Sequence, residues 1–149
     1  MRILLQRVSS ASVDVAGECV GSIERGLLAL LGLDKGDDRD TGDRMLDKLL
    51  AYRVFPDAQG RMNCSVADAG GGVLLVSQFT LSADTRKGLR PSFSSAMPPA
   101  DAEGLYDYML EQLQDRHTPV AAGRFGADMQ VALVNDGPVT FLLERMGSE

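Results

Sequence analysis

The chain has 149 residues, 44 % of them hydrophobic and 24 % charged, which is typical of a soluble globular protein with one domain over residues 1–149. Acidic residues outnumber basic ones by 21 to 15, and the net charge of −6 argues against nucleic-acid binding through bulk charge. One histidine, His117, and two distant cysteines, Cys19 and Cys64, exclude two-histidine zinc motifs and CxxC redox pairs.

We therefore expect neither a metal nor another cofactor. No apolar run approaches the roughly 20 residues that cross a bilayer, and the N-terminal segment has no signal-peptide cleavage site. These features predict a cytoplasmic protein with reduced thiols and no membrane contact. We interpret both cysteines as small filler residues and His117 as a cation that complements a helix end.

The first third of the sequence predicts β-structure. Apolar and polar residues alternate over residues 3–8 and again over residues 12–15, and residues 16–18 form a turn. The continuous apolar run at residues 27–31 predicts a strand covered on both faces. The acidic stretch Asp34–Asp40 lacks the spacing of a calcium-binding loop and predicts a solvated loop.

Two helices are predicted. The first has Asp40 or Thr41 as its N-cap and an apolar stripe from Met45 to Leu50. The second is announced by the Pro98-Pro99 pair, because proline is tolerated in a first helical turn.

Further strands are predicted after each helix. Residues 73–76 form a buried strand, and residues 129–134 and 139–143 form two strands joined by a hairpin-like turn at residues 135–138. Because the helices do not alternate regularly with the strands, the pattern favours an α+β fold over a doubly wound sheet.

Two neighbouring segments suggest chemistry. Ser77, Gln78, Phe79 and Thr80 follow the buried strand directly, and their hydroxyl, amide and backbone N–H groups suit an oxyanion pocket. Residues 82–93, the basic loop, hold three bases and one acid and suit a phosphate-bearing substrate. A polar strand end and a solvated loop are the simpler interpretations of these two segments.

Several segments together resemble the D-aminoacyl-tRNA deacylase family, also called the D-tyrosyl-tRNA deacylases. The resemblance runs from Met1 to about Leu143 and depends on the order and spacing of its motifs. These motifs are Leu5-Gln6-Arg7-Val8, Ala11-Ser12-Val13, Ser77-Gln78-Phe79-Thr80-Leu81, Gly88-Leu89-Arg90-Pro91-Ser92-Phe93, Gly123-Arg124-Phe125-Gly126-Ala127-Asp128-Met129 and Asn135-Asp136-Gly137-Pro138-Val139-Thr140.

The resemblance implies an enzyme that hydrolyses the ester between a D-amino acid and tRNA and also clears mischarged glycine, notably from tRNA for alanine. It implies a homodimer with a three-layer β/β/α architecture, mostly antiparallel strands and two main helices. The partner is the acceptor end of an aminoacyl-tRNA, with no role for DNA. In the family the active sites lie at the dimer interface.

The resemblance also implies residue roles. Gly137 and Pro138 would form a cis pair that reaches into the partner's site, captures the substrate amino group through backbone carbonyls and excludes an L side chain. Arg7 would orient that pair, Ser77 to Thr80 would line the pocket, and Ala96 would lie at its edge.

The catalytic role of Thr80 has two interpretations in the family, a nucleophile or a group that positions the ribose. A threonine nucleophile needs a base, and residues 77–81 contain no histidine, lysine or carboxylate. We therefore favour attack by water, with the Phe79 and Thr80 N–H groups stabilising the oxyanion. An inert tRNA-end or nucleotide-binding module, a structural dimerisation domain and a general esterase are the alternatives, although the esterase lacks a G-x-S-x-G elbow.

Overall fold

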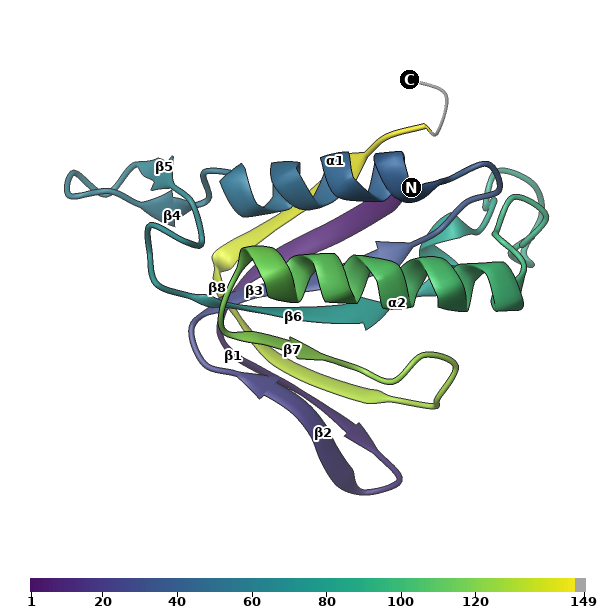
Figure 1. The fold of residues 1–149 in the computed structure, drawn as a ribbon, viewed down its shortest axis with the longest axis horizontal. Helices are drawn as coiled ribbons and strands as arrows, with labels where there is room; N and C mark the ends of the chain where they lie inside the picture. Colours follow the sequence, from purple (N-terminus) through teal and green to yellow (C-terminus); the bar gives the residue numbers. More distant parts are fainter. Residues whose placement is uncertain (147–149) are drawn as a thin grey trace.

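Strand β1 (Arg2–Val15) organises the sheet, which we describe from a computed structural model covering residues 1–146. The final residues of the C-terminal tail, 147–149, lie outside the described part. The first half of β1 pairs antiparallel with β3 (Gly26–Gly32), and its second half pairs with β2 (Glu18–Ile23). Along its other edge β1 pairs antiparallel with β8 (Gln130–Glu144), so that β1 is the centre of three pairings (Figure 1).

The remainder of this sheet is parallel. β6 (Gly72–Ser77) pairs parallel with β3, and β7 (Val120–Ala122) pairs parallel with β6. Helix α1 (Arg39–Ala51) lies in the connection from β3 to β6, and helix α2 (Pro99–Arg116) lies in the connection from β6 to β7. The predicted α+β fold is confirmed, and three of the five pairings in this sheet are antiparallel.

Three short elements complete the described chain. β4 (Phe55–Pro56) and β5 (Met62–Cys64) form a small antiparallel pair, and η1 (Phe79–Ser82) is one turn of 3₁₀ helix after β6. The sequence patterns did not predict β4, β5 or β7, because each holds only two or three residues and shows no periodicity.

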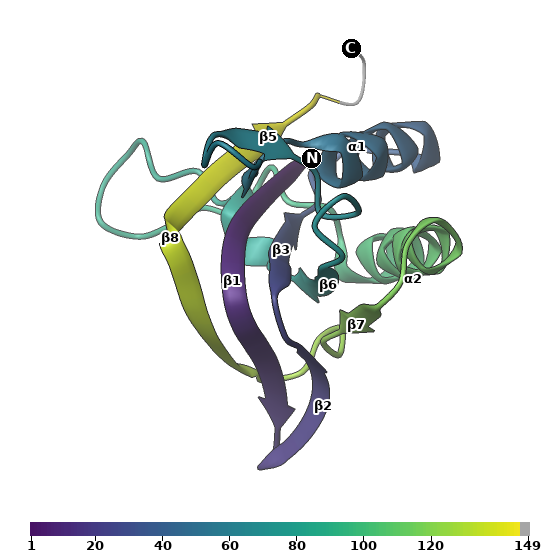
Figure 2. The same cartoon turned by 90° about the vertical axis from the view of Figure 1, so that its left-hand side faces the viewer.

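The sheet separates two hydrophobic clusters. Both helices lie on one face of the sheet (Figure 2). There they form one apolar cluster with alternate residues of β3 and β6 such as Leu27 and Leu75. The intervening residues Leu28 and Leu74 point to the other face, where they pack against the second half of β1. The helices therefore cover one face of the sheet, and a second apolar cluster, which includes residues from the second half of β1, covers the other face.

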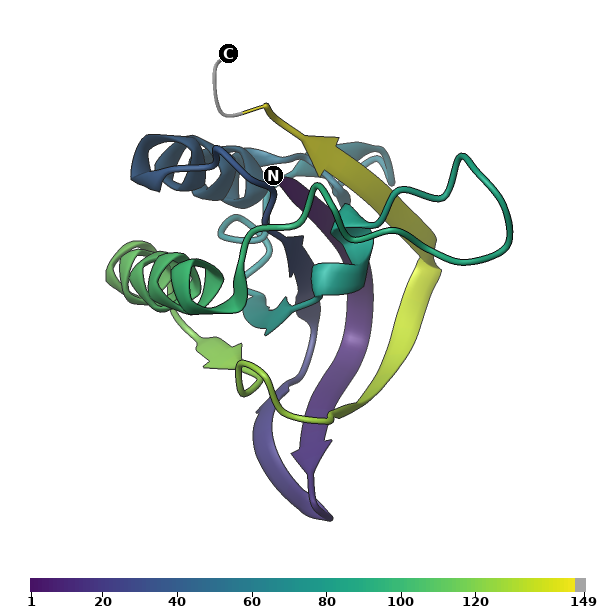
Figure 3. The same ribbon diagram turned by 90° about the vertical axis from the view of Figure 1, so that its right-hand side faces the viewer.

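The C-terminal strand differs from the prediction. Residues 129–134 and 139–143 do not form a hairpin, because both run antiparallel to β1 in the same direction and belong to the single strand β8. The Gly137–Pro138 bond is cis, and the register with β1 shifts around it. The turn residues therefore produce a bend within one strand, visible in Figure 3, and not a reversal of the chain.

The helix ends are partly as predicted. The N-cap of α1 is Asp38, not Asp40 or Thr41, and its carboxylate accepts hydrogen bonds from the backbone N–H and hydroxyl of Thr41. Helix α2 begins at Pro99 with Pro98 as its N-cap, so the proline pair marks the start of this helix as predicted. His117 is the C-cap of α2, where its Nε2 atom lies 2.8 Å from the carbonyl oxygen of Gly71.

Two predictions about polar residues are wrong. Asp34 is only 5 % exposed, because Arg2 and the terminal ammonium of Met1 both pair with its carboxylate, so the acidic stretch is not simply a solvated loop. Cys19 is exposed and therefore does not fill the core. No helix within residues 1–146 has the length and apolar character needed to cross a membrane.

Candidate active site

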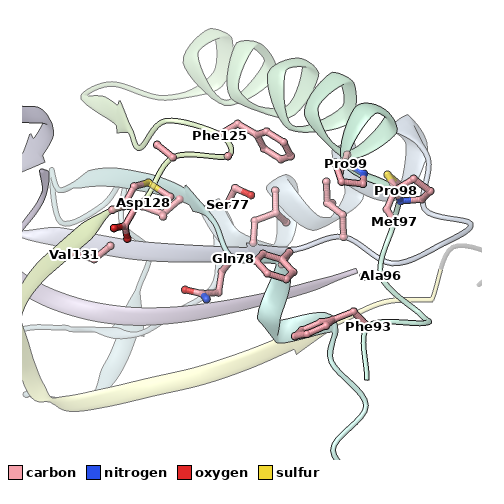
Figure 4. A pocket seen from close by; sticks show the side chains of 18 of the residues that line it. Ser77, Gln78, Phe93, Ala96, Met97, Pro98, Pro99, Phe125, Asp128 and Val131 are labelled. Carbon is pink, nitrogen blue, oxygen red and sulfur yellow. The ribbon is translucent and has the colours of Figure 1, made fainter. Parts of the chain in front are cut away.

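A cavity of about 670 Å³ opens at the carboxyl end of β6 (Figure 4). Four residues predicted from the sequence line it, namely Ser77, Gln78, Phe79 and Ala96. Its other walls come from the end of β3, the start of α2 and the segment before β8. The structure thus brings residues from four separate parts of the chain to one opening.

The turn into η1 is held by backbone contacts with β3. The N–H of Gln78 donates to the carbonyl of Leu31 at 2.8 Å, which continues the β3–β6 pairing one residue past the strand. Gly32 lies directly against η1, and a Cβ atom at Gly32 would be 2.8 Å from Cβ of Leu81. A glycine at this position therefore lets the 3₁₀ turn that carries Phe79 and Thr80 pack on the sheet.

Thr80 is exposed and does not line the cavity. Its Oγ1 atom accepts a hydrogen bond from the side-chain amide of Gln78. Phe79 and Thr80 are the first two residues of η1, and the first N–H groups of a helix have no acceptor within it. The start of η1 therefore offers backbone N–H groups next to the cavity.

Ala96 is held in the cavity wall by its neighbours. The N–H of Met97 donates to Leu33 O at 3.0 Å, and the N–H of Lys35 donates to Ser95 O at 2.9 Å. These bonds join the segment before α2 to the segment after β3. Because the buried Asp34 lies in the middle of that second segment, its ion pairs support this wall.

Arg7 contacts the segment that precedes Gly137. Its Nε atom donates to the carbonyl oxygen of Asp136 at 3.1 Å, and its Nη1 atom donates to Val54 O at 2.7 Å. The Arg7 side chain is 12 % exposed and its Nε lies 3.6 Å from the Asp136 carboxylate. One guanidinium therefore ties the bend of β8 to the chain after α1.

The Asn135 side chain bridges the Gly137–Pro138 bend. Its Oδ1 atom accepts from the N–H of Val139 at 3.0 Å, and its Nδ2 atom donates to Oγ1 of Thr140 at 2.9 Å. Gly137 has a φ of +134°, and a Cβ atom there would lie 2.6 Å from Cγ2 of Val139, so this backbone requires glycine.

The predicted site residues form two groups within one chain. Gly137 and Pro138 are exposed, and neither lines the cavity that Ser77, Gln78 and Phe79 line. Apolar side chains are exposed on β8 on both sides of this pair: Leu133, Val134, Phe141 and Leu142. A single chain therefore presents a cavity and, separately, a bend flanked by apolar surface.

The cavity also holds residues to which the sequence analysis gave no role. Phe93 and Phe125 line it together with Asp128 and Lys35. Phe93 packs on Phe79 with 5.1 Å between ring centroids, and these rings are 39 % and 61 % exposed. Phe93 belongs to the basic loop, and Phe93, Phe125 and Asp128 lie in motifs that carry the resemblance, whereas no sequence signal pointed to Lys35.

Tyr106 attaches α2 to the strand that leads into the cavity. Its hydroxyl donates to the carbonyl of Leu75 at 3.0 Å. Burial, with a smaller contribution from the charge of Asp107, raises the pKa of Tyr106 to about 12, so it remains a neutral donor. Within residues 1–146, no group of three or more His, Cys, Asp or Glu side chains is arranged to hold a metal ion.

Comparison with known proteins defines the class. Proteins named D-aminoacyl-tRNA deacylase from Stutzerimonas stutzeri and Azotobacter vinelandii are 65 % and 64 % identical, each over 97 % of this chain and 99 % of the relative. Such proteins are hydrolases that act on D-aminoacyl-tRNA. The family model described as D-Tyr-tRNA(Tyr) deacylase matches residues 4–144, and the chain belongs to this family.

Solved structures give the same fold. A structure titled c-Myc DNA Unwinding Element Binding Protein is 44 % identical, with a TM-score of 0.94 over 98 % of this chain and 99 % of the other. A structure titled as a probable eukaryotic D-amino acid tRNA deacylase is 17 % identical with a TM-score of 0.79, over 95 % of this chain and 97 % of the other. At that identity the second likeness concerns the fold alone.

Proposed function

We propose that the chain, as one deacylase domain, removes D-amino acids and mischarged glycine, for example from tRNA for alanine, while it spares L-aminoacyl-tRNA. The acceptor end of the tRNA is its ligand, and the cavity at the end of β6 receives the ester. The observation that carries this proposal is the exposed Gly137–Pro138 bend, which lies outside the cavity of its own chain.

The active unit is a homodimer. The exposed apolar residues of β8 that flank the bend supply a surface for a second copy, and a two-fold contact buries the same residues on both chains. In this arrangement Gly137 and Pro138 of the second copy enter the cavity of the first. Arg7 of that second copy orients the pair through its hydrogen bond to the carbonyl oxygen of Asp136 in the same chain.

Stereochemical selection follows from backbone contacts. Carbonyl oxygens of the inserted bend accept hydrogen bonds from the substrate ammonium group, and the bend occupies the space in which an L side chain would lie. Glycine has no side chain, so a site that rejects L-amino acids by steric exclusion still accepts glycine.

Water is the nucleophile in the proposed reaction. It adds to the ester carbonyl, and the N–H groups of Phe79 and Thr80 stabilise the resulting oxyanion. Collapse of this intermediate breaks the bond to the ribose oxygen, which takes a proton, and releases the free D-amino acid and tRNA. The Thr80 hydroxyl accepts from the Gln78 amide, a donor and not a base, which supports a positioning role.

The terminal adenosine has a surface to contact. Phe79 and Phe93 form an exposed aromatic pair beside the cavity, and aromatic rings are common stacking partners for unpaired bases. Ser77, Gln78 and Ala96 then face the ester region from the cavity wall.

The test is a deacylation assay with D-Tyr-tRNA, L-Tyr-tRNA and Gly-tRNA(Ala) prepared on matched tRNAs. We expect release of D-tyrosine and glycine and retention of L-tyrosine. Efficient cleavage of L-Tyr-tRNA would refute selection by steric exclusion. A protein that binds the tRNA without releasing an amino acid would instead be a binding module.

A further inference from the structure

The basic loop, residues 82–93, projects beyond the body of the molecule on the side of β8. Figures 2 and 3 show it from two directions as the long connection between η1 and α2. All residues from Thr85 to Ser95 are exposed, and Leu89 at the tip is fully exposed. The tip of the loop is therefore left open to solvent, whereas its ends contact the body of the protein through the buried Ser82 and through Phe93, which packs on Phe79.

Hydrogen bonds close the base of the loop. Asp84 and Ser92 exchange backbone hydrogen bonds, with N···O distances of 2.7 and 3.0 Å. The Asp84 carboxylate accepts from the Arg86 backbone N–H and from two guanidinium nitrogens, at 2.9 to 3.0 Å. These hydrogen bonds from Arg86 lower the pKa of Asp84 to about 2, so the pair is charged at neutral pH.

The basic residues of the loop differ in whether they form an ion pair. Arg86 is neutralised by Asp84, whereas Lys87 and Arg90 form no ion pair within residues 1–146. The loop carries +2 in a chain of −6, which leaves −8 for the remainder. Two exposed, unneutralised cations therefore lie close together in the loop, while the remainder of the chain has a net negative charge.

We propose that Lys87 and Arg90 bind backbone phosphates of the tRNA strand whose terminal nucleotide occupies the cavity, and that Arg86 shapes the loop through Asp84. This inference rests on the proposed placement of the ester in the cavity. Phe93, the last residue of the loop, lines that cavity. Two residues separate it from Arg90, a reach of about 10 Å in an extended chain.

This arrangement separates two tasks. The cavity recognises the amino acid and the terminal nucleotide, while the loop attracts the adjoining backbone without reading its sequence. The acidic remainder of the protein repels RNA elsewhere, so the two cations also restrict how the strand approaches the cavity.

The experiment compares Lys87→Ala, Arg90→Ala and the double variant on two substrates. One substrate is full-length D-Tyr-tRNA, and the other is the D-tyrosyl ester of adenosine, which has no backbone phosphate. On the tRNA we expect kcat/KM to fall about fivefold for each single variant and about 25-fold for the double, mainly through KM. On the adenosine ester all variants remain within twofold of wild type.

Salt dependence supplies a second measurement. Each lost phosphate contact on a single strand reduces the slope of log affinity against log salt by about 0.7. The exposed Lys48 and Arg61 lie on other parts of the chain, so the double variant Lys48→Ala/Arg61→Ala matches the charge change and leaves the tRNA reaction unchanged. The variant pair Lys87→Arg/Arg90→Lys keeps both charges and stays within about twofold of wild type.

Three results would overturn the proposal. They are an unchanged kcat/KM on tRNA, an equal loss on both substrates, and a change in the oligomeric state of the double variant, which would assign the loop to a protein contact. Binding of uncharged tRNA is measured in parallel. A wild type that binds tRNA through the loop but hydrolyses neither ester would refute the proposed function and leave the loop inference standing.

Discussion

The Nε atom of Arg7 lies 3.1 Å from the carbonyl oxygen of Asp136, the residue that precedes Gly137 in β8. The same guanidinium donates to Val54 O at 2.7 Å, so it spans two segments that are far apart in the sequence. Guanidinium donors have a rigid planar arrangement. The two hydrogen bonds of Arg7 therefore fix the position of the bend, in addition to placing a positive charge beside it.

Arg7→Lys is therefore expected to impair the enzyme. An ammonium group is a compact charge and does not reproduce two hydrogen bonds in divergent directions. We expect kcat/KM on D-Tyr-tRNA to fall about 10- to 100-fold, because a small displacement of a positioning group has this effect. The free energy of unfolding should fall by about 1–3 kcal/mol, measured by urea denaturation.

Arg44→Lys is the matched control for that prediction. Arg44 forms an exposed i,i+4 ion pair with Asp40, and such pairs contribute little to stability. Its activity and midpoint of unfolding should equal those of wild type. An Arg7→Lys enzyme with full activity would show that Arg7 does not orient the bend.

Subunit complementation tests whether Gly137 acts on the other chain. Ala96→Phe fills the cavity wall, and Gly137→Val introduces a side chain where φ is +134°. Each variant alone should be inactive. Equal co-expression yields mixed dimers with one intact cavity and one intact bend together, so about a quarter of wild-type activity returns.

A second mixture controls for nonspecific rescue. Ala96→Phe combined with Ser77→Trp damages the same cavity on both chains and should restore no activity, since both residues line it. If the first mixture also stays inactive although mixed dimers form, the bend does not act across a dimer.

Local patterns predicted both helices and the location of the longer strands, because alternation and helical spacing report which side chains face the core. They predicted a hairpin at residues 135–138 because asparagine, aspartate and glycine favour turns wherever they occur. Whether such residues reverse the chain or bend one strand depends on the strand alongside, here β1. The residues near the turn therefore do not by themselves determine whether the chain reverses or bends.

The candidate site shows the same limit. Ser77 to Thr80 could be identified from polar residues after a buried strand, but Phe125 and Asp128 reach the cavity only through the tertiary fold. The burial of Asp34 was missed because its cationic partner Arg2 lies 32 residues away in the sequence.

The role of Thr80 can be decided by comparing two substitutions. If Thr80 positions the substrate, Thr80→Ala should lower the single-turnover rate on D-Tyr-tRNA about tenfold and leave measurable activity. Thr80→Ser keeps the hydroxyl that accepts from Gln78 and should remain close to wild type. Intact-protein mass spectrometry of quenched reactions should show no acyl adduct. A D-tyrosyl adduct on Thr80, with no activity in Thr80→Ala, would establish it as the nucleophile.

Asp34 should make the stability of the protein depend on pH. Burial acts to raise the pKa of Asp34, but the nearby Ser82 hydroxyl, Met1 ammonium and Arg2 guanidinium hold it below the usual value of 3.8. The ionised form is therefore favoured in the folded state. Its stabilising effect is fully present above the unfolded pKa and is lost as the pH falls through the folded pKa.

Asp34→Asn tests this linkage. Asparagine keeps the shape but not the charge, so the free energy of unfolding at pH 7 should fall by about 2 kcal/mol. The difference between wild type and variant should shrink below pH 4, because the Asp34 carboxylate is protonated first in the unfolded chain and, at lower pH, in the folded protein as well. Asp40→Asn removes the carboxylate of an exposed ion pair with Arg44 and should leave the free energy of unfolding almost unchanged over this pH range. A difference between wild type and Asp34→Asn that stays constant from pH 7 to pH 3 would show that the charge of Asp34 does not stabilise the wall beside Ala96.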